Sequence, residues 1–492
     1  GKGNLTVQLI GNLQTVSTRS ETIQAQEFPN DALLKSYNNA LRKTFVENFR
    51  QRKTVSGAFI VRYALDNKYV ININARRDGS SHFGPGKQFG NFASAGLAWI
   101  ASDEKWLRQI MPSWFSFFKL RSSYGITGSD NIQDYEYLSR WSKSDRLGST
   151  RTLFRYNGLD AFHVIKPMNQ QFQWESTTQS ELGISMAFLE SRISLELSFY
   201  RKVTDNQLTD LPMPILTGFP SVIANSEAKV ANKGIEIALS ASLINTKDWR
   251  LDFGFNLGSN SNKLLAFPNL ERSSYRERLR IGESLTSQYF LKFTGIDPLT
   301  GNGTYEDRNK DGVITVGSGN FPLSDIDDRY IPVDFSAPRF SGGFNIDASY
   351  KSLSVSANFS LVNRRIAHPY LVMVPGQQMN IAIPDEVKNN HWQKPGDQAK
   401  YPRYSTTGAS ISRSSDANFV NGSYLRMTNM AVAYKLPAKW ISKIRMKDAG
   451  FSIKTQNLFT ISPFKGVNPD LESGIFVTPL PTTIATSISL NF

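Results

Sequence analysis

The sequence lacks cysteine, long apolar runs and an obvious leader. Without cysteine among its 492 residues, it can form no disulfide, thiolate metal site or cysteine nucleophile. No stretch approaches the roughly 18 consecutive apolar residues that a membrane helix needs, so a helical membrane protein is excluded. The chain opens GKGNLTVQL, without the basic, apolar and small regions of a signal peptide. We therefore expect either a mature chain or one whose N-terminus is missing.

Patterns that mark enzymes and nucleic-acid binding are also scarce. The four histidines are spread along the chain without a spaced pair: His82, His163, His368 and His391. The segment GPGKQFG (84–90) lacks the spacing of a phosphate-binding loop. The net charge is +14, but the basic residues form no run of five or more. We predict no enzyme activity and no nucleic-acid partner; the charge fits solvated loops, anionic lipid headgroups or an acidic partner.

The clearest pattern that is present is alternation of apolar and polar residues. In FSGGFNIDASYKSLSVSANFSL (340–361), apolar residues alternate with polar ones on both sides of a break at Lys351-Ser352. A period of two predicts two antiparallel strands joined by a tight turn. The polar face consists mostly of Ser, Asn and Asp, which suits a wet interior. Its apolar counterpart must then contact something other than water.

This pattern recurs about sixteen times at the lengths of tilted membrane strands. Segment 302–308 is the weakest and is included partly because an even alternation of connections requires it. The predicted strands are 4–25, 46–64, 68–77, 89–101, 114–127, 177–188, 191–212, 225–243, 247–262, 287–297, 302–308, 340–350, 352–363, 420–435, 448–460 and 482–492.

Short and long connections alternate strictly between these strands. Compact connections lie near 65–67, 102–113, 189–190, 244–246, 298–301, 351 and 436–447, whereas the others are longer and rich in Gly, Pro, Asn, Ser and aromatic residues. Tight turns at one end and large loops at the other are typical of outer-membrane barrels. Only a closed barrel satisfies every backbone group within lipid. We predict an all-β fold, a transmembrane antiparallel β-barrel.

Aromatic residues near the predicted strand ends support this fold, because such residues sit at membrane interfaces. They are Tyr63, Tyr69, Trp99, Trp114, Phe118, Tyr124, Trp249, Tyr350 and Tyr434. The chain ends TTIATSISLNF, and Phe492 resembles the terminal aromatic signal read by bacterial outer-membrane assembly machinery. The alternative is an ordinary edge strand that ends in Phe.

Four stretches of the chain are distinctive. They are NKYVININARRDGSSHFGPGKQFGNFASAGLAWIASDEKWL (67–107), FTGIDPLTGNGTYEDRNKDGVIT (293–315), HWQKPGDQAKYPRY (391–404) and SYLRMTNMAVAYKLP (423–437). These and other stretches resemble, in the family's order, the SusC-like TonB-dependent transporters of the Bacteroidetes outer membrane. The resemblance implies a bacterial outer-membrane importer of oligosaccharides or peptides. It also implies a SusD-like surface lipoprotein as partner, energy coupling to TonB, and contact with outer-membrane lipid or lipopolysaccharide.

The resemblance covers only the C-terminal part of such a transporter. Barrels of about 22 strands have a plugged lumen, so some six strands are unaccounted for. We expect residues 1–492 to be the C-terminal barrel portion, with the plug, the TonB box and the N-terminal strands outside this sequence. Two alternatives stay open: a passive porin-like channel, and a scaffold subunit of a larger outer-membrane assembly or secretion complex.

One loop has the spacing of metal ligands. Asp307, Asn309 and Asp311, followed by Gly312, match the first half of an EF-hand-type calcium loop, with the Val313 carbonyl at the seventh position. The twelfth position is Ser318 instead of Glu, and Lys310 lies inside the loop. We expect a weak Ca²⁺ site; the alternative is a solvated turn.

The long loops carry aromatic and amide residues that suit sugar stacking, peptide binding, or packing of loops on each other or on a lid protein. We expect ligand or partner contacts first in loops 128–176 and 364–419. The aromatic residues are Phe154, Tyr156, Phe162, Phe172, Trp174, Phe219, Tyr275, Phe321, Tyr330, Tyr370, Trp392, Tyr401 and Tyr404, and the amides are Asn169, Gln170, Gln171, Gln377, Gln378 and Asn380.

Overall fold

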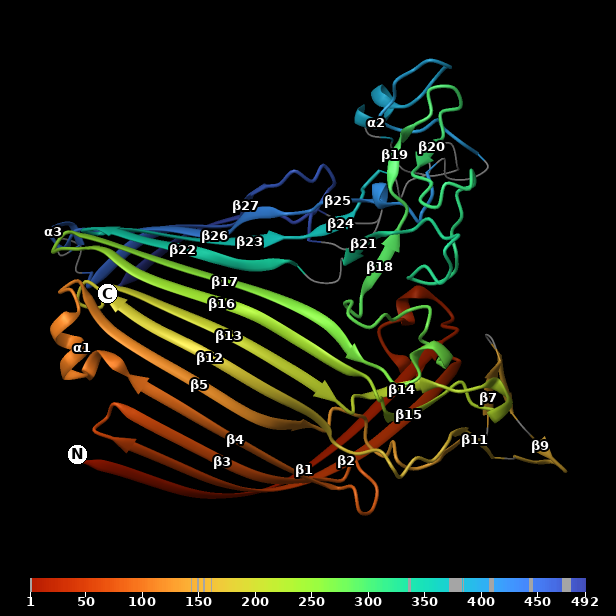
Figure 1. Cartoon of the computed structure of the whole chain (residues 1–492), viewed down its shortest axis with the longest axis horizontal. Helices are drawn as coiled ribbons and strands as arrows, with labels where there is room; N and C mark the ends of the chain where they lie inside the picture. The colour runs from red at the N-terminus through yellow and green to blue at the C-terminus, as the bar shows by residue number, and fades with distance from the viewer. Residues whose placement is uncertain are drawn as a thin grey trace. The chain divides into compact units, whose positions relative to one another are not determined.

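Fourteen long strands form one antiparallel sheet (Figure 1). The computed structural model describes residues 2–142, 144–147, 150–153, 155–160, 162–334, 338–370, 383, 385–406, 411–441, 446–470 and 479–492. The sheet strands, in the order in which they pair, are β1 (Gly3–Gln26), β2 (Arg42–Leu65), β3 (Tyr69–Ser80), β4 (Phe89–Ile100), β5 (Phe115–Ser129), β12 (Glu175–Phe188), β13 (Ile193–Asp205), β16 (Lys229–Asn245), β17 (Trp249–Ala266), β22 (Phe340–Tyr350), β23 (Leu353–Asn363), β26 (Tyr424–Lys435), β27 (Asp448–Ile461) and β28 (Thr483–Asn491).

Shorter elements lie in the connections. The helices are α1 (Lys105–Ile110), α2 (Asp385–Asn390) and α3 (Ala438–Ile441). The short strands are β6 (Arg140–Ser142), β7 (Ser144–Leu147), β8 (Thr150–Leu153), β9 (Arg155–Tyr156), β10 (Leu159–Asp160), β11 (His163–Lys166), β14 (Leu208–Pro212), β15 (Ser221–Asn225), β18 (Ser287–Phe290), β19 (Phe293–Ile296), β20 (Gly303–Tyr305), β21 (Ile331–Asp334), β24 (Arg365–Ala367) and β25 (Phe419–Asn421). None of the helices in the described ranges has the length and hydropathy to cross a membrane.

The structure confirms the predicted antiparallel fold and corrects the strand count. Predicted segments 287–297 and 302–308 are not sheet strands; they form short loop strands, with β18 pairing β21 and β19 pairing β20. Phe290 and Leu291 are both buried, so the apolar residues of this segment pack inside a loop instead of lining one face of the large sheet, which we call the wall. Predicted segment 191–212 divides into β13 and β14 at Asn206, whose φ of 55° interrupts the strand.

Short and long connections still alternate, because 267–339 becomes one long loop. The tightest turns use residues in the left-handed region, as at Asp66 and Asn67 between β2 and β3 and at Lys351 between β22 and β23. Positive φ angles let a short turn follow the right-handed twist of the strands it joins. The turns therefore have a local cause in the sequence.

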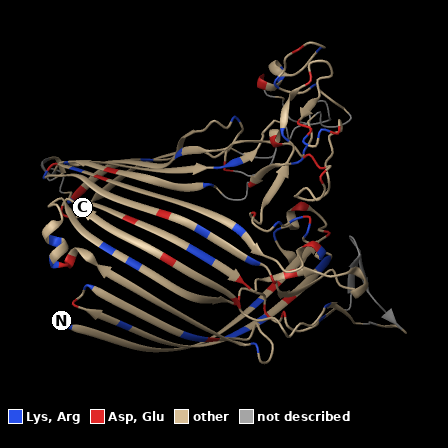
Figure 2. Cartoon of the chain, in the orientation of Figure 1, with Lys and Arg blue, Asp and Glu red and all other residues tan. Residues whose placement is uncertain are grey.

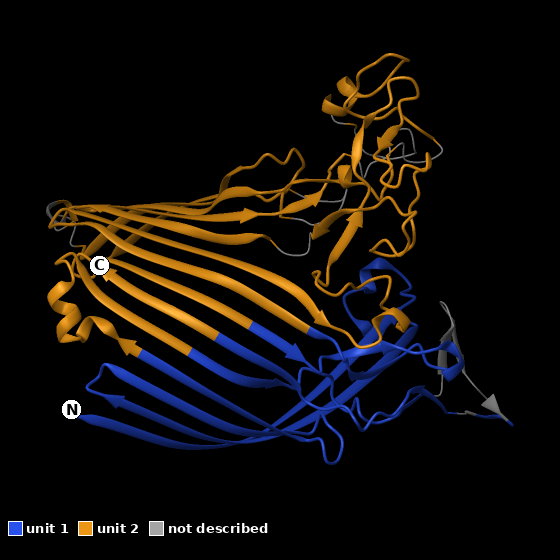
Figure 3. Cartoon of the chain, in the orientation of Figure 1, with its two compact units in different colours: residues 1–98, 123–180, 202–229 blue, residues 99–122, 181–201, 230–492 orange. Residues whose placement is uncertain are grey.

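The chain consists of two compact units (Figure 3). Unit 1 comprises residues 1–98, 123–180 and 202–229, and unit 2 comprises 99–122, 181–201 and 230–492. In unit 2, α1 and α3 lie at one end of the strands, whereas β18 and β21 lie at the other (Figure 1).

The apolar face of the wall is exposed. On β3, Tyr69, Ile71 and Ile73 are each more than 40% exposed, with Asn72 and Asn74 at the alternate positions. In a soluble β-sandwich, the apolar residues Leu251, Phe253, Leu353 and Phe359 would be buried. Here none of the four is buried, and Leu353 is exposed. Since exposed apolar area costs about 25 cal/mol per Å² in water, this face requires an apolar surrounding.

The largest fully buried side chains lie in loops and at strand ends. They are Phe83, Phe172, Phe321, Leu264, Leu291, Val230 and Val333. Buried apolar packing therefore stabilises mainly the loop regions. The large sheet is stabilised by its backbone hydrogen bonds and by cross-strand pairs such as Phe344 and Phe359, whose stacked rings have centroids 4.4 Å apart.

Candidate functional site

The polar face of unit 2 carries a charged network in the middle of its strands (Figure 2). Arg121 on β5 donates to Glu181 on β12 at 3.2 Å and to the Ser198 hydroxyl on β13 at 2.6 Å. The Glu196 carboxylate lies 3.8 Å from the same guanidinium and accepts a 2.7 Å bond from Ser185. Three neighbouring strands are thus linked by polar side chains, as expected of a wall with a wet interior.

A glycine makes room for this arginine. A Cβ atom at Gly183 would lie 2.0 Å from Arg121 Nε and 2.6 Å from its Cγ. Because real Cβ atoms do not approach so closely, any side chain at this position would displace Arg121. The network therefore depends on a residue that itself has no polar group.

Further along the polar face, amides and hydroxyls replace the charges. Asn262 donates to Asn232 at 3.0 Å, Asn260 accepts from the Tyr200 hydroxyl at 3.1 Å, and Asn358 donates to Asn429 at 2.6 Å. Neutral groups of this kind can exchange hydrogen bonds with a polar solute without binding it tightly. Such a surface suits the passage of a polar solute along the strands.

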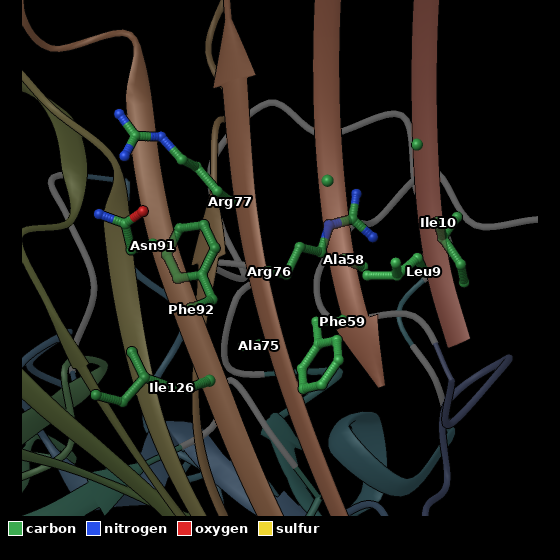
Figure 4. A pocket seen from close by; sticks show the side chains of 13 residues that line it. Leu9, Ile10, Ala58, Phe59, Ala75, Arg76, Arg77, Asn91, Phe92 and Ile126 are labelled. Carbon is green, nitrogen blue, oxygen red and sulfur yellow. The ribbon is translucent and has the colours of Figure 1, made fainter. Parts of the chain in front are cut away.

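A pocket of about 730 Å³ in unit 1 has a different character (Figure 4). Most of its lining is apolar or small, and Gly11 and Gly57 face each other in the register of β1 and β2. A Cβ at either glycine would meet nothing within 4 Å, so the missing side chains leave this space open. At the edge of this pocket, the Arg77 guanidinium forms a cation–π contact with Phe89, and its Cζ atom lies 4.9 Å from the ring centroid. The lining suits an acyl chain better than a sugar.

In unit 1, the loop after β3 is bound to the loop after β5 by a buried histidine. The two ring nitrogens of His82 lie 2.8 Å from the Asp130 carbonyl and 2.9 Å from an Asp134 carboxylate oxygen. Burial opposes a charge on the ring, but hydrogen bonds and the charge of Asp130, with a hydrogen bond to Asp134, outweigh it and raise the pKa of His82. The hydrogen bond to His82 lowers the pKa of Asp130. This histidine has a structural role.

Two of the loop aromatics, Phe172 and Trp174, pack loops together, which is one of the roles that the sequence allowed for them. Phe172 is buried against Phe83, with ring centroids 5.8 Å apart, and Trp174 lies 5.1 Å from the same ring. Trp174 also donates to the Gln88 carbonyl at 3.1 Å. Asn169 donates to the Ile223 carbonyl at 2.7 Å. In this part of unit 1, loop packing accounts for these side chains.

The loop layer of unit 2 holds a second aromatic group. Tyr401 lies 6.0 Å from His368 and 6.4 Å from Tyr370, and its hydroxyl donates to Glu386 at 3.1 Å. Burial, with the nearby charge of Lys400, lowers the pKa of His368 to about 4, so this ring is neutral at neutral pH. Burial and the bond to Glu386 raise the pKa of Tyr401 to about 12.

The other predicted loop residues divide by exposure. Phe162 is 66% exposed and Phe321 is fully buried, whereas Trp392 lies over Gly301 and donates to the Pro298 carbonyl at 2.8 Å. Tyr404 stacks on His391 at 4.1 Å. Phe154, Gln377, Gln378, Asn380 and the Tyr156 side chain lie outside the described part of the chain.

The predicted calcium loop brings Asp307, Asn309 and Asp311 together. The Asp307 carboxylate accepts bonds from the backbone of Lys310 and Gly312, Asn309 Oδ1 accepts from Asp311, and Asp311 accepts from Val313. The Val313 side chain is exposed. In the described ranges, no three Asp, Glu or His side chains converge as a metal site. Calcium binding by Asp307, Asn309, Asp311 and Val313 stays a prediction.

Two aspartates further on support this loop in different ways. Asp328 is fully buried, and its carboxylate accepts bonds from the backbone of Arg308 at 2.8 Å and Thr315 at 2.8 Å. Asp327 pairs with Arg329, which also donates to the Gly319 carbonyl at 2.6 Å. The sequence analysis predicted neither the Asp327–Arg329 pair nor the Arg121 network. A signal for the network was present, because Arg121, Glu181 and Glu196 are opposite charges at polar positions of alternating strands.

Phe492 follows β28 and is 67% exposed. Its role as an assembly signal stays a prediction. The preceding apolar residues of β28, Ile484, Ile488 and Leu490, are also exposed, which is the pattern expected of a strand that faces lipid.

An antiparallel sheet with one exposed apolar face, one polar face and alternating short and long connections is typical of the β-barrel proteins of the bacterial outer membrane. The chain matches the family model described as TonB dependent receptor-like, beta-barrel over residues 2–458. It belongs to this TonB-dependent receptor-like β-barrel family, whose members are receptors and transporters of the outer membrane.

Two curated relatives come from Bacteroidetes. TonB-dependent receptor SusC of Bacteroides thetaiotaomicron is 26% identical over 482 residues, covering 94% of this chain and 45% of SusC. TonB-dependent receptor P3 of Formosa agariphila is 27% identical over 438 residues, covering 83% of this chain and 41% of that protein. The chain thus spans less than half the length of these relatives.

Solved structures show the same fold. The RagAB peptide transporter aligns with a TM-score of 0.77 at 21% identity, over 99% of this chain and 53% of that one. The SusC-like resemblance and the barrel fold predicted from the sequence are confirmed.

Proposed function

We propose that this chain is the C-terminal barrel portion, residues 1–492, of an importer that takes oligosaccharides or peptides across the outer membrane with a SusD-like surface lipoprotein. The observation that carries the proposal is the two-faced wall: an exposed apolar face, and a polar face with the Arg121 network and amides. The family match and the SusC relative support it.

The strand count supports additional strands from the same protein. In the described sheet, β1 pairs only with β2, and β28 only with β27. Unpaired backbone groups within lipid cost several kcal/mol each, so both edges need partners. A barrel of about 22 strands would supply about eight more and hold a plug. The plug would carry the segment that TonB contacts.

Uptake by the full-length protein tests the proposal. We expect that deleting its gene abolishes uptake of one oligosaccharide or peptide class, and that a protonophore has the same effect in the wild-type strain, since TonB-driven transport needs the proton gradient. Uptake that survives the protonophore would indicate a passive channel. Purification of the membrane complex completes the test. Recovery with one surface lipoprotein supports import, whereas loops occluded by several other subunits would support a scaffold.

A further inference from the structure

Unit 2 contains a second pocket, of about 540 Å³, at the loop end of β17. Its volume lies in the range of small-molecule sites. Four segments that are separate in the sequence contribute to it: the end of β17, the start of β18 with the loop before it, β21 with Pro338 and Arg339, and the start of β24 with the residue before it. The lining residues that the argument uses are Asn262, Lys263, Glu283, Asp334, Arg339 and Arg365.

Hydroxyl and amide groups make up much of this lining. Ser259, Ser261, Ser284 and Ser287 line the pocket together with Asn260 and Asn262. Some are held in place: Asn262 accepts a bond from Leu285 N at 3.1 Å, and Ser259 donates to the Arg339 carbonyl at 2.7 Å. These groups match the hydroxyls of a sugar. The apolar residues of the lining are Pro332, Val333 and Pro338, and Val333 is buried, so the pocket offers a bound peptide little apolar side-chain surface.

Cations outnumber anions in the lining. Lys263, Arg339, Arg364 and Arg365 face only two acids, Glu283 and Asp334. Both acids accept bonds from neutral groups, Glu283 from the Tyr289 hydroxyl at 2.9 Å and Asp334 from Thr286 at 2.8 Å.

Three of these cations are available to a ligand. Within the part of the chain that the structure describes, no carboxylate forms a salt bridge with Lys263, Arg339 or Arg365. All three residues are exposed. Arginine binds planar anions through paired N–H donors, and lysine adds a point charge. The pocket thus combines an unbalanced positive charge with neutral donors and acceptors.

We propose that this pocket binds an anionic oligosaccharide, with Arg339, Lys263 and Arg365 contacting a carboxylate or sulfate group and the Ser and Asn residues contacting sugar hydroxyls. The inference rests on the proposed import function and narrows its substrate to acidic glycans.

Calorimetry on the purified full-length transporter tests this with matched sugars. One pair is trigalacturonate and its fully methyl-esterified form; the other is a sulfated galactose disaccharide, which has no carboxylate, and its desulfated form. We expect at least one anionic sugar to bind roughly tenfold or more tighter than its neutral partner, since hydrogen bonds to charged groups are the stronger ones. We also expect this difference to shrink as salt is raised. Equal binding of both members of each pair, or binding of neither, would overturn the inference.

Variants assign the effect to this pocket. Arg339→Gln and Lys263→Gln should each weaken binding of the anionic sugar roughly tenfold and leave that of the neutral partner unchanged. Arg339→Lys should retain part of the affinity. The matched control is Arg272→Gln, an exposed arginine of the same long loop that does not line the pocket.

Other outcomes separate this inference from the import function. Uptake of neutral oligosaccharides with no effect of the variants would leave import intact and refute the anionic site. If the variants altered only retention on vesicles that contain lipopolysaccharide, the cations would bind lipid phosphate and the inference would also fail. Preferential binding of an acidic peptide of matched charge would refute the oligosaccharide as ligand.

Discussion

Single residues decide whether the loop at 307–313 can hold a cation. Asp307 and Asp311 already accept backbone N–H bonds, and so does the buried Asp328 behind them. A carboxylate oxygen has two lone pairs, so these bonds leave room for a metal contact. The unusual Ser318 and Lys310 lower the expected affinity because they remove one ligand and add a positive charge.

If the loop binds calcium, millimolar Ca²⁺ should raise the melting temperature of the full-length protein by a few degrees, because a ligand that binds only the folded state stabilises it. The Asp311→Asn variant should lose this shift, and Mg²⁺ should not replace Ca²⁺. The control is Asp325→Asn, outside the calcium-loop sequence. An unchanged melting temperature in wild type would identify the loop as a turn held by its own backbone bonds.

At the scale of elements, β22 depends on glycines where it meets its neighbours. A Cβ at Gly342 would lie 2.1 Å from the Asn256 carbonyl oxygen of β17, and one at Gly343 would lie 2.3 Å from the Phe359 carbonyl oxygen of β23. Backbone atoms cannot move aside as a flexible side chain can. This part of the wall therefore tolerates no side chain at either position.

We expect Gly343→Val to reduce the folded fraction strongly, since overpacking typically costs about 1–3 kcal/mol and here strains two strands. Folding is measured by the heat-dependent shift in gel mobility of barrel proteins. Gly11→Val is the matched control, because a Cβ at Gly11 meets nothing within 4 Å. Equal folding of both variants would contradict the close approach at β22.

At the scale of the whole molecule, a wall with an apolar outer face must reach the membrane before it can aggregate. The exposed β28, followed by Phe492, presents the kind of alternating apolar segment that an assembly machine could bind. Exposed apolar strands of this kind are aggregation sites in water.

Replacing Phe492 by Ser in the full-length protein should lower the amount assembled in the outer membrane several-fold, and Phe492→Tyr should restore most of it. Protein that does assemble should unfold at the wild-type temperature, because the side chain is exposed and contributes little to packing. Membrane fractionation and heat-dependent gel mobility give the two readouts. Normal assembly of the Ser variant would show that Phe492 is only the end of a strand.

The sequence alone was sufficient for the wall, because alternation is a local property that each strand carries by itself. Fourteen of the predicted segments overlap the fourteen sheet strands, and the alternation of short and long connections between them was predicted as well. The prediction from the sequence was wrong at 287–297, where Phe290 and Leu291 are apolar but pack inside a loop. Apolar content cannot distinguish burial in a loop from exposure to lipid.

Tertiary structure alone decided which side chains meet. Arg121 lies beside Glu181 and Glu196 because β5, β12 and β13 are neighbours in the sheet. Lys263, Arg339 and Arg365 line one pocket although they come from separate segments. Such meetings depend on strand register and on the paths of long loops. Neither is encoded in any short stretch of residues, so the polar network and the cationic pocket emerged only from the folded chain.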